Sequence, residues 1–167
     1  MWTLLLTSIS AAIFVGFVLI CIGHFGIQPC YSAYGPLWHE KYPPVNIWSV
    51  VTFLTAALLV PVILQATLGS AWQAVAFFCP AMLMFVAATP DYETSAFVHT
   101  VHALAAGTSA VLSLLFIVLM APYLWPLVVT YLLFATAAML IWGEETAMFW
   151  YEMAAYALIY TAMFMLV

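Results

Sequence analysis

Long apolar runs with almost no charge, separated by short breaks, constrain this chain more than any other feature. They lie near residues 3 to 23, 46 to 67, 71 to 88, 97 to 120, 122 to 142 and 147 to 167. A helix that crosses a bilayer needs about 20 mostly apolar residues, and these runs are about that long. Their continuity also differs from the alternating polarity of strands in a membrane β-barrel. We therefore predict an all-α, polytopic integral membrane protein, with residues 1–167 forming one helical bundle.

Six transmembrane helices follow from these runs. Only Ala121 and Pro122 separate the fourth run from the fifth, so five helices remain an alternative. Composition supports insertion in either case: 69% of the residues are hydrophobic and 4% are charged, whereas about a quarter of a soluble domain is charged. The lipid bilayer is the expected partner.

Charge excludes one class of partner and suggests an orientation. Lys41 is the single basic residue against six acids, and nucleic-acid binding needs clustered Lys or Arg. Six crossings place the first, third and fifth connections on one side of the membrane. Those connections hold His39, Glu40, Lys41, Asp91, Glu93, Glu144 and Glu145. By the positive-inside rule, Lys41 places this side in the cytoplasm, and we expect a bacterial inner membrane.

Two histidines and a glutamate lie within the apolar runs. His99 and His102 are three residues apart, which places them on one side of a helix. His102 is about 8 Å inside its helix end at roughly 1.5 Å of rise per residue, and Glu152 has a comparable depth in the last helix. Ionisable groups within a membrane span are costly unless they are paired. We therefore expect His102 and Glu152 to be direct partners.

These side chains suggest two interpretations. Histidines and carboxylates suit zinc, and a zinc-bound water is a hydrolytic nucleophile. The first interpretation makes the metal ligands His24, His99 and His102, and the catalytic acids and bases Asp91, Glu93 and Glu152. In the second, the buried pair only locks two helices together. Asp91 and Glu93 then stabilise the start of the following helix through its dipole.

The three cysteines form neither a metal-binding spacing nor a disulfide framework. Cys79 is expected to be a small buried hydrophobe. Cys21 and Cys30 flank the same connection and would pair only if that connection faced an oxidising compartment.

Four stretches carry a resemblance to known proteins, namely Gly26–Tyr34, Trp72–Phe77, Met84–Pro90 and Val98–His99. In this order they resemble an uncharacterised family of small bacterial multi-pass membrane proteins. That resemblance implies the fold and no activity. A looser one is to membrane hydrolases of the alkaline ceramidase and adiponectin-receptor type, which hold zinc with intramembrane histidines and an acid. Those enzymes have seven spans and a histidine pair four residues apart, whereas His99 and His102 are three apart.

Three functions are compatible with these features. The first is a metal-dependent hydrolase of lipid or another membrane-embedded substrate. The second is a non-enzymatic membrane subunit or scaffold with a structural His/Glu pair, which associates with itself or with other subunits through small residues at Ala103, Gly107 and Ala110. The third is a proton-coupled transporter or small channel in which His102 and Glu152 relay protons.

Overall fold

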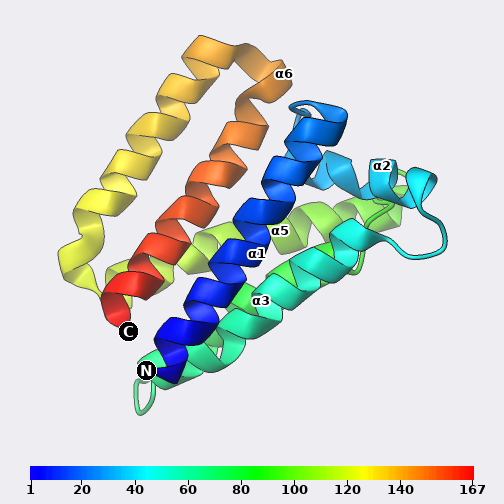
Figure 1. Cartoon of the computed structure of the whole chain (residues 1–167). Coiled ribbons are helices and arrows are strands. Elements are labelled where there is room, and N and C mark those ends of the chain that lie inside the picture. The colour runs from blue at the N-terminus through cyan, green and yellow to red at the C-terminus, as the bar shows by residue number, and fades with distance from the viewer.

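The predicted all-helical fold is confirmed in the computed structural model, which describes the backbone of residues 1–167 and every side chain except those of Glu144 and Glu145. Figure 1 shows the arrangement. The helices are α1 (Trp2–Phe25), η1 (Tyr31–Ala33), α2 (Tyr34–Lys41), α3 (Ile47–Ala66), α4 (Gln73–Ala87), α5 (Ala96–Met120), η2 (Pro122–Leu124) and α6 (Trp125–Leu166). α1, α3, α4 and α5 each agree with a predicted apolar run to within a few residues, and α6 covers the last two runs.

α6 is bent sharply at Gly143, which has a φ of 67°. This left-handed conformation suits glycine because a side chain would clash with the backbone. The bend separates two apolar segments that run antiparallel (Figure 1): Pro122–Gly143, which comprises η2 and the first part of α6, and Thr146–Leu166. The predicted break between the last two runs is therefore confirmed.

Five helical segments are long and apolar enough to cross a membrane: Trp2–Phe25, Ile47–Ala66, Ala96–Met120, Pro122–Gly143 and Thr146–Leu166. η2 separates α5 from α6, so the fourth and fifth runs are distinct helices. The shorter segment is α4, with 15 residues. At roughly 1.5 Å per residue it extends about 22 Å, against about 30 Å of hydrocarbon. These lengths are compatible with an integral membrane protein.

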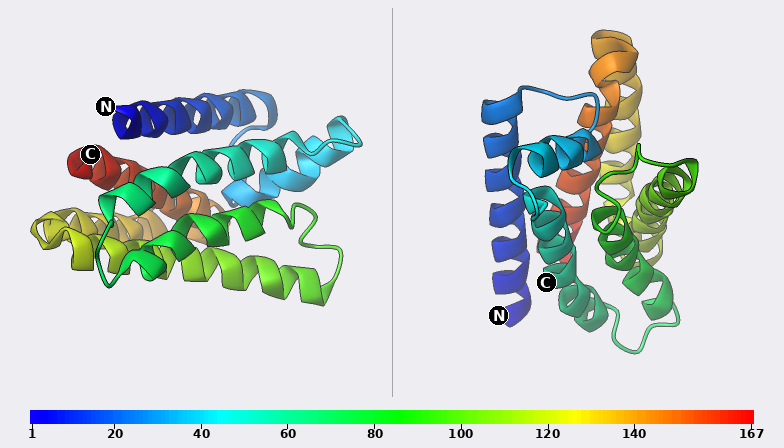
Figure 2. Two further views of the ribbon diagram at one scale, coloured as in Figure 1. Left: turned by 90° about the horizontal axis from the view of Figure 1, so that it is seen from below. Right: turned by 90° about the vertical axis from the view of Figure 1, so that its right-hand side faces the viewer.

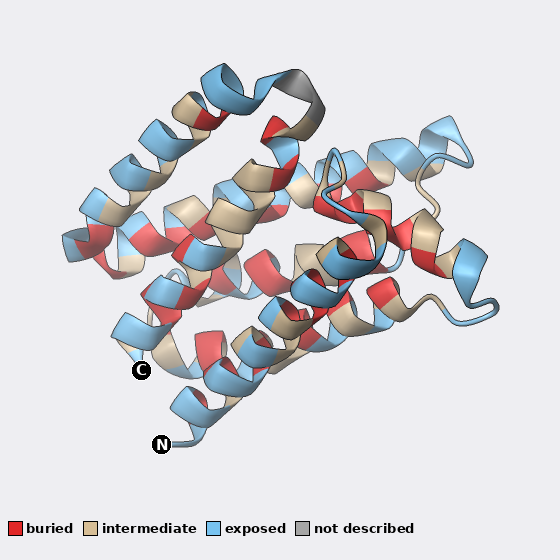
Figure 3. Cartoon of the chain, turned by 45° about the horizontal axis from the view of Figure 1, so that its top comes forward, coloured by how far each residue is buried: buried red, intermediate tan, exposed pale blue. Residues whose placement is uncertain are grey.

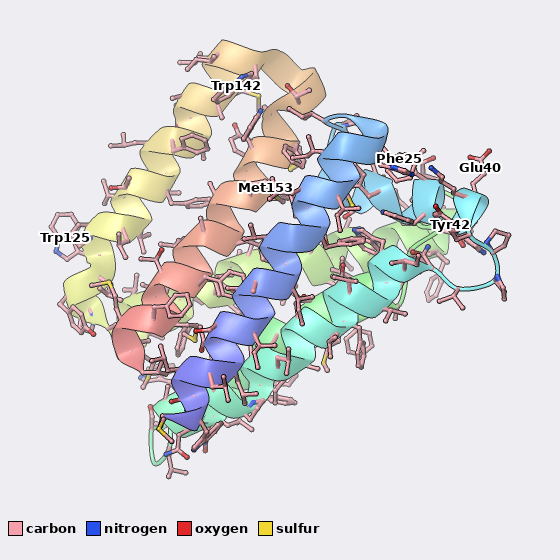
Figure 4. The ribbon with its side chains drawn as sticks, viewed as in Figure 1. Phe25, Glu40, Tyr42, Trp125, Trp142 and Met153 are labelled. Carbon is pink, nitrogen blue, oxygen red and sulfur yellow. The ribbon has the colours of Figure 1, made fainter. Side chains whose placement is uncertain are left out.

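The outer surface of the bundle is apolar. Large exposed side chains such as Leu19, Val50 and Leu140 lie on it, and Figure 3 shows exposed residues along the outer faces of the long helices. Trp125 and Trp142 lie at opposite ends of the first segment of α6 (Figure 4), which are the positions that tryptophan favours at membrane interfaces. The surface is therefore of the kind that faces lipid.

Hydrogen bonds between side chains and neighbouring helices join α1 to α3 and α6, and α4 to α5. Figure 2 shows the arrangement of these helices. Ser10 Oγ on α1 donates to the Thr55 carbonyl of α3 at 2.9 Å and lies 2.8 Å from Tyr160 Oη on α6. Ser109 Oγ on α5 donates to the Cys79 carbonyl of α4 at 2.9 Å. In lipid, where apolar burial gives helices little reason to associate, such bonds and close packing hold a bundle together.

The first and third connections and the beginning of the last segment of α6 meet at one end of the bundle. His39 Nδ1 on α2 lies 2.7 Å from Asp91 Oδ2 in the α4–α5 connection. The backbone N–H of Phe149, in the last segment of α6, donates to the Pro29 carbonyl in the α1–α2 connection at 2.9 Å. Both termini lie at the opposite end (Figure 1).

Candidate functional site: a buried serine and histidine

The connection between α1 and α2 turns back against the bundle, and α6 binds its backbone. The Tyr31 N–H donates to the Glu152 carboxylate, and the Pro29 carbonyl accepts from the Phe149 N–H. The backbone N–H of Phe149 can donate to Pro29 because a new helical segment begins after the break at Gly143, and the first N–H groups of a helical segment lack partners within it. Buried non-helical backbone needs partners of this kind. Glu152 and Phe149 thus fix the position of this connection.

This connection brings Ser32 to His102. Ser32 Oγ, in η1, lies 2.9 Å from His102 Nε2 on α5. Both side chains are 6% exposed. On the other side of the imidazole, His102 Nδ1 lies 3.1 Å from the Thr89 carbonyl oxygen and 3.0 Å from Thr89 Oγ1. The ring is therefore held between two polar groups of the chain.

The partners of Nδ1 determine which nitrogen of His102 carries the proton. The Thr89 carbonyl only accepts hydrogen bonds. Thr89 Oγ1 donates its own proton to the carbonyls of Phe85 and Val86, which lie at 3.2 and 3.1 Å, and therefore also accepts from the ring. With two acceptors at Nδ1, that nitrogen carries the proton in the neutral ring. The lone pair of Nε2 then points at Ser32, whose hydroxyl donates to it.

Aromatic rings surround the imidazole. The Tyr92 ring stacks on His102 at a centroid distance of 4.5 Å, and the fully buried Trp48 ring lies 6.5 Å away at a similar tilt. Burial raises the pKa of the Tyr92 phenol. It also raises the pKa of the Cys30 thiol, and the charge of Glu152 adds to that rise. Cys30 is therefore a protonated thiol at neutral pH, which is a poor nucleophile.

Helix α2 covers the end of the site. A Cβ atom on Gly35 would lie 2.8 Å from the Pro90 carbonyl oxygen and 3.3 Å from Cε3 of Trp48. Glycine thus allows α2 to approach both the α4–α5 connection and the indole. The contact between His39 and Asp91 joins the far end of α2 to the same connection.

Neither Asp91 nor Glu93 caps the helix that they precede. Ser95 is the N-cap of α5, and its Oγ accepts from the Val98 N–H at 3.2 Å. Asp91 instead binds His39, and Glu93 is exposed.

His102 and Glu152 come to the same region, as predicted, but they bind different atoms of one turn. His102 binds the Ser32 side chain, whereas Glu152 binds the adjacent backbone N–H of Tyr31. The predicted direct bond between them is absent from the hydrogen bonds of the described residues. Each group is satisfied by the inserted connection.

The predicted zinc ligands are not gathered. His24 contacts Lys41 and stacks on Trp38, and His99 is exposed beside Tyr92. Both nitrogens of His102 already bind protein atoms. Among the side chains that the structure describes, no three of His, Cys, Asp or Glu form a group suited to a metal ion. These residues therefore do not fit a zinc site.

Two residues of the site were not predicted. Ser32 and Thr89 have no distinguishing neighbours in the sequence. The cysteines are free thiols, and Cys21 accepts a hydrogen bond from Trp38 Nε1 at 3.2 Å.

A cavity of about 80 Å³ adjoins the site and is lined by both Ser32 and Glu152. Comparison with known proteins adds no information on its use: no protein family, no curated protein and no solved structure matches the chain. The geometry of the site alone carries the functional argument.

Proposed function

We propose that the protein is a membrane-embedded hydrolase in which Ser32 is the nucleophile and His102 the general base. The observation that carries this proposal is the orientation of the imidazole, whose Nδ1–H is held by Thr89 and whose Nε2 faces the Ser32 hydroxyl. A nucleophile bonded to a base that a third group orients is the arrangement that activates a serine. The reaction class is the hydrolysis predicted from the sequence, with a serine in place of a metal-bound water.

The reaction begins when Ser32 Oγ attacks the carbonyl carbon of an ester or amide. The hydroxyl proton passes to His102 Nε2, and the carbonyl electron pair moves to its oxygen. When the tetrahedral adduct collapses, the bond to the leaving group breaks, and the imidazolium gives its proton to that group. A water molecule then attacks the acyl-serine with His102 as base, which releases the carboxylic acid and restores the Ser32 hydroxyl.

Glu152 is a positioning residue in this scheme. Its carboxylate holds the N–H of Tyr31, the residue directly before the nucleophile. This hydrogen bond to a residue of α6 thereby helps to determine where the Ser32 backbone lies. This role needs an acceptor at position 152 and does not need a titrating acid.

Hydrolysis of p-nitrophenyl acetate by purified protein in mild detergent tests the proposal. Ser32→Ala removes the nucleophile. His102→Gln retains an acceptor near the serine but cannot carry a proton away. We expect each variant to lose at least about 100-fold in kcat/KM, within the range for removing a general base. Ser113→Ala is the matched control, because Ser113 is a buried serine of α5 that donates to the Ser109 carbonyl and does not line the cavity beside Ser32.

The control should hydrolyse the ester at the natural rate. Natural rates in Ser32→Ala would contradict the proposal. A protein that is folded by circular dichroism yet shows no turnover above the buffer rate would contradict it equally.

A second candidate is the non-enzymatic subunit, and one observation favours it. Ala103 and Gly107 of α5 are exposed, and small residues on a helix surface allow another helix to approach closely in lipid. In that case the bonds of Ser32 and His102 only fix the inserted connection. Light scattering in mild detergent would show a dimer that Gly107→Leu dissociates, together with a Ser32→Ala variant that has no chemical phenotype.

We also propose that the charged end faces the cytoplasm of a bacterial inner membrane, on the support of Lys41. A cysteine introduced at the exposed Glu40 tests this orientation. It should be protected in intact cells from a thiol reagent that does not cross the membrane, and labelling of intact cells would reverse the assignment.

A further inference from the structure

The cavity beside the site has one polar end and apolar walls. Ser32, Glu152 and Tyr156 line the polar end, and Ser109 lies on the wall that α5 contributes. The remaining lining consists of Tyr31 together with small and branched apolar residues, namely Leu83, Val86, Ala106, Ala110, Ala155 and Ile159. Binding sites for small molecules have this composition, with few polar groups and mostly apolar surface.

The size of the cavity limits what it can hold. Its volume is about 80 Å³. A cavity of about 150 Å³ lined by apolar side chains admits benzene, which has six carbons. By proportion this cavity admits an alkyl chain of about three carbons, such as that of a butyryl group whose carbonyl lies at Ser32.

Three helices contribute the apolar residues that line the cavity. α4 contributes Leu83 and Val86, α5 contributes Ala106, and α6 contributes Ile159. Ala106 is one turn beyond His102 on α5, and Ile159 is two turns beyond Glu152 on α6, so the walls begin where the polar groups end. A chain that is bound with its carbonyl at Ser32 would extend toward these residues.

We infer that this cavity is the acyl pocket of the proposed hydrolase, and that its substrates are esters or amides of short acyl groups of about two to four carbons. This inference rests on the proposed function, because it assigns the cavity by its position beside the nucleophile. The cavity then determines the acyl part of the substrate and excludes the long acyl chains of membrane lipids.

A chain-length series tests the inference with p-nitrophenyl acetate, butyrate, hexanoate and octanoate as probes. In the natural chain, kcat/KM should be highest for acetate or butyrate and at least about tenfold lower for hexanoate and octanoate, because each methylene that does not fit a pocket costs about tenfold or more. Ile159→Ala deepens the cavity and should raise the hexanoate-to-acetate ratio at least about tenfold. Ala106→Val narrows it and should lower the butyrate-to-acetate ratio.

Ile63→Ala is the matched control, because it removes the same atoms from a buried residue of α3 that does not line the cavity. It should leave all ratios at their natural values. Ratios between chain lengths report the pocket even when a variant lowers the yield of folded protein.

The outcomes separate the two claims. Ser32-dependent turnover with a preference for octanoate, or with ratios that Ile159→Ala and Ala106→Val leave unchanged, would overturn the acyl pocket and leave the serine hydrolase standing. An absence of Ser32-dependent turnover with all four esters would overturn both.

Discussion

Replacement of Glu152 tests how the site is held together. In the structure its carboxylate accepts from the backbone N–H of Tyr31, and this bond fixes the turn that carries Ser32. Glu152→Ala leaves that N–H without an acceptor inside the bundle. An unsatisfied buried donor costs about 1–3 kcal/mol, so we expect the free energy of unfolding to fall by that amount. Activity should fall further, because the nucleophile loses its fixed position.

Glu152→Gln tests whether Glu152 acts through its hydrogen bond to Tyr31 or through its negative charge. The amide carbonyl of Gln can accept from the same N–H, and only the extra strength of a charged acceptor is lost, about 1 kcal/mol. We therefore expect Glu152→Gln to keep most of the stability and at least about a tenth of the natural ester turnover, a loss of about 1.4 kcal/mol at most. Glu152→Ala should retain much less.

Thermal unfolding in mild detergent measures the stability, and p-nitrophenyl acetate turnover measures the activity. Equal and complete loss of turnover in both variants would refute the positioning role. It would instead make the Glu152 carboxylate an acid or base in the chemistry, as predicted from the sequence. Natural stability in Glu152→Ala would refute the bond to Tyr31.

Three further predictions concern the residues around the site. Gly35→Ala should lower the free energy of unfolding by about 1–3 kcal/mol, the usual cost of overpacking, because the added Cβ atom would lie 2.8 Å from the Pro90 carbonyl oxygen. Thermal unfolding checks this, and an unchanged unfolding midpoint would contradict it. The indole N–H of Trp48 is buried without a partner among the described residues. Replacing Trp48 by benzothienylalanine, which keeps the shape of the side chain and removes the N–H, should therefore raise the midpoint of thermal unfolding. A lower midpoint would show that the N–H has a partner. Burial raises the pKa of the Cys30 thiol. Alkylation of Cys30 in a Cys21→Ser, Cys79→Ser background should therefore be slow at neutral pH, and its rate should still increase above pH 9. An alkylation rate that levels off below pH 8 would contradict the raised pKa.

The helices of this protein could be predicted from sequence because lipid leaves few alternatives. An uncharged run such as that in α1 must be helical and must face lipid, whatever its neighbours do. The parity of the crossings predicts that the charged connections lie on one side, and the contact between His39 and Asp91 joins the first connection to the third. α2 was not predicted, because it is only eight residues long and lies in a polar segment without a long apolar run.

The site could be predicted only in part, for a geometric reason. Depth along a helix follows from residue number, so His102 and Glu152 were correctly placed near one another. Depth does not show what lies between two helices, and here the turn at Tyr31 and Ser32 occupies that space. The insertion depends on bonds between residues more than 60 positions apart, such as Ser32 with His102. No local pattern predicts them.

Covalent labelling of Ser32 tests the central claim most directly. A fluorophosphonate reacts with a serine that a neighbouring base activates and spares ordinary serines. Mass spectrometry of the treated and digested protein should find one adduct, on Ser32, which forms in the natural chain and in Ser113→Ala but not in His102→Gln. An unmodified Ser32 in folded natural protein, or an adduct that forms as fast in His102→Gln, would contradict the account.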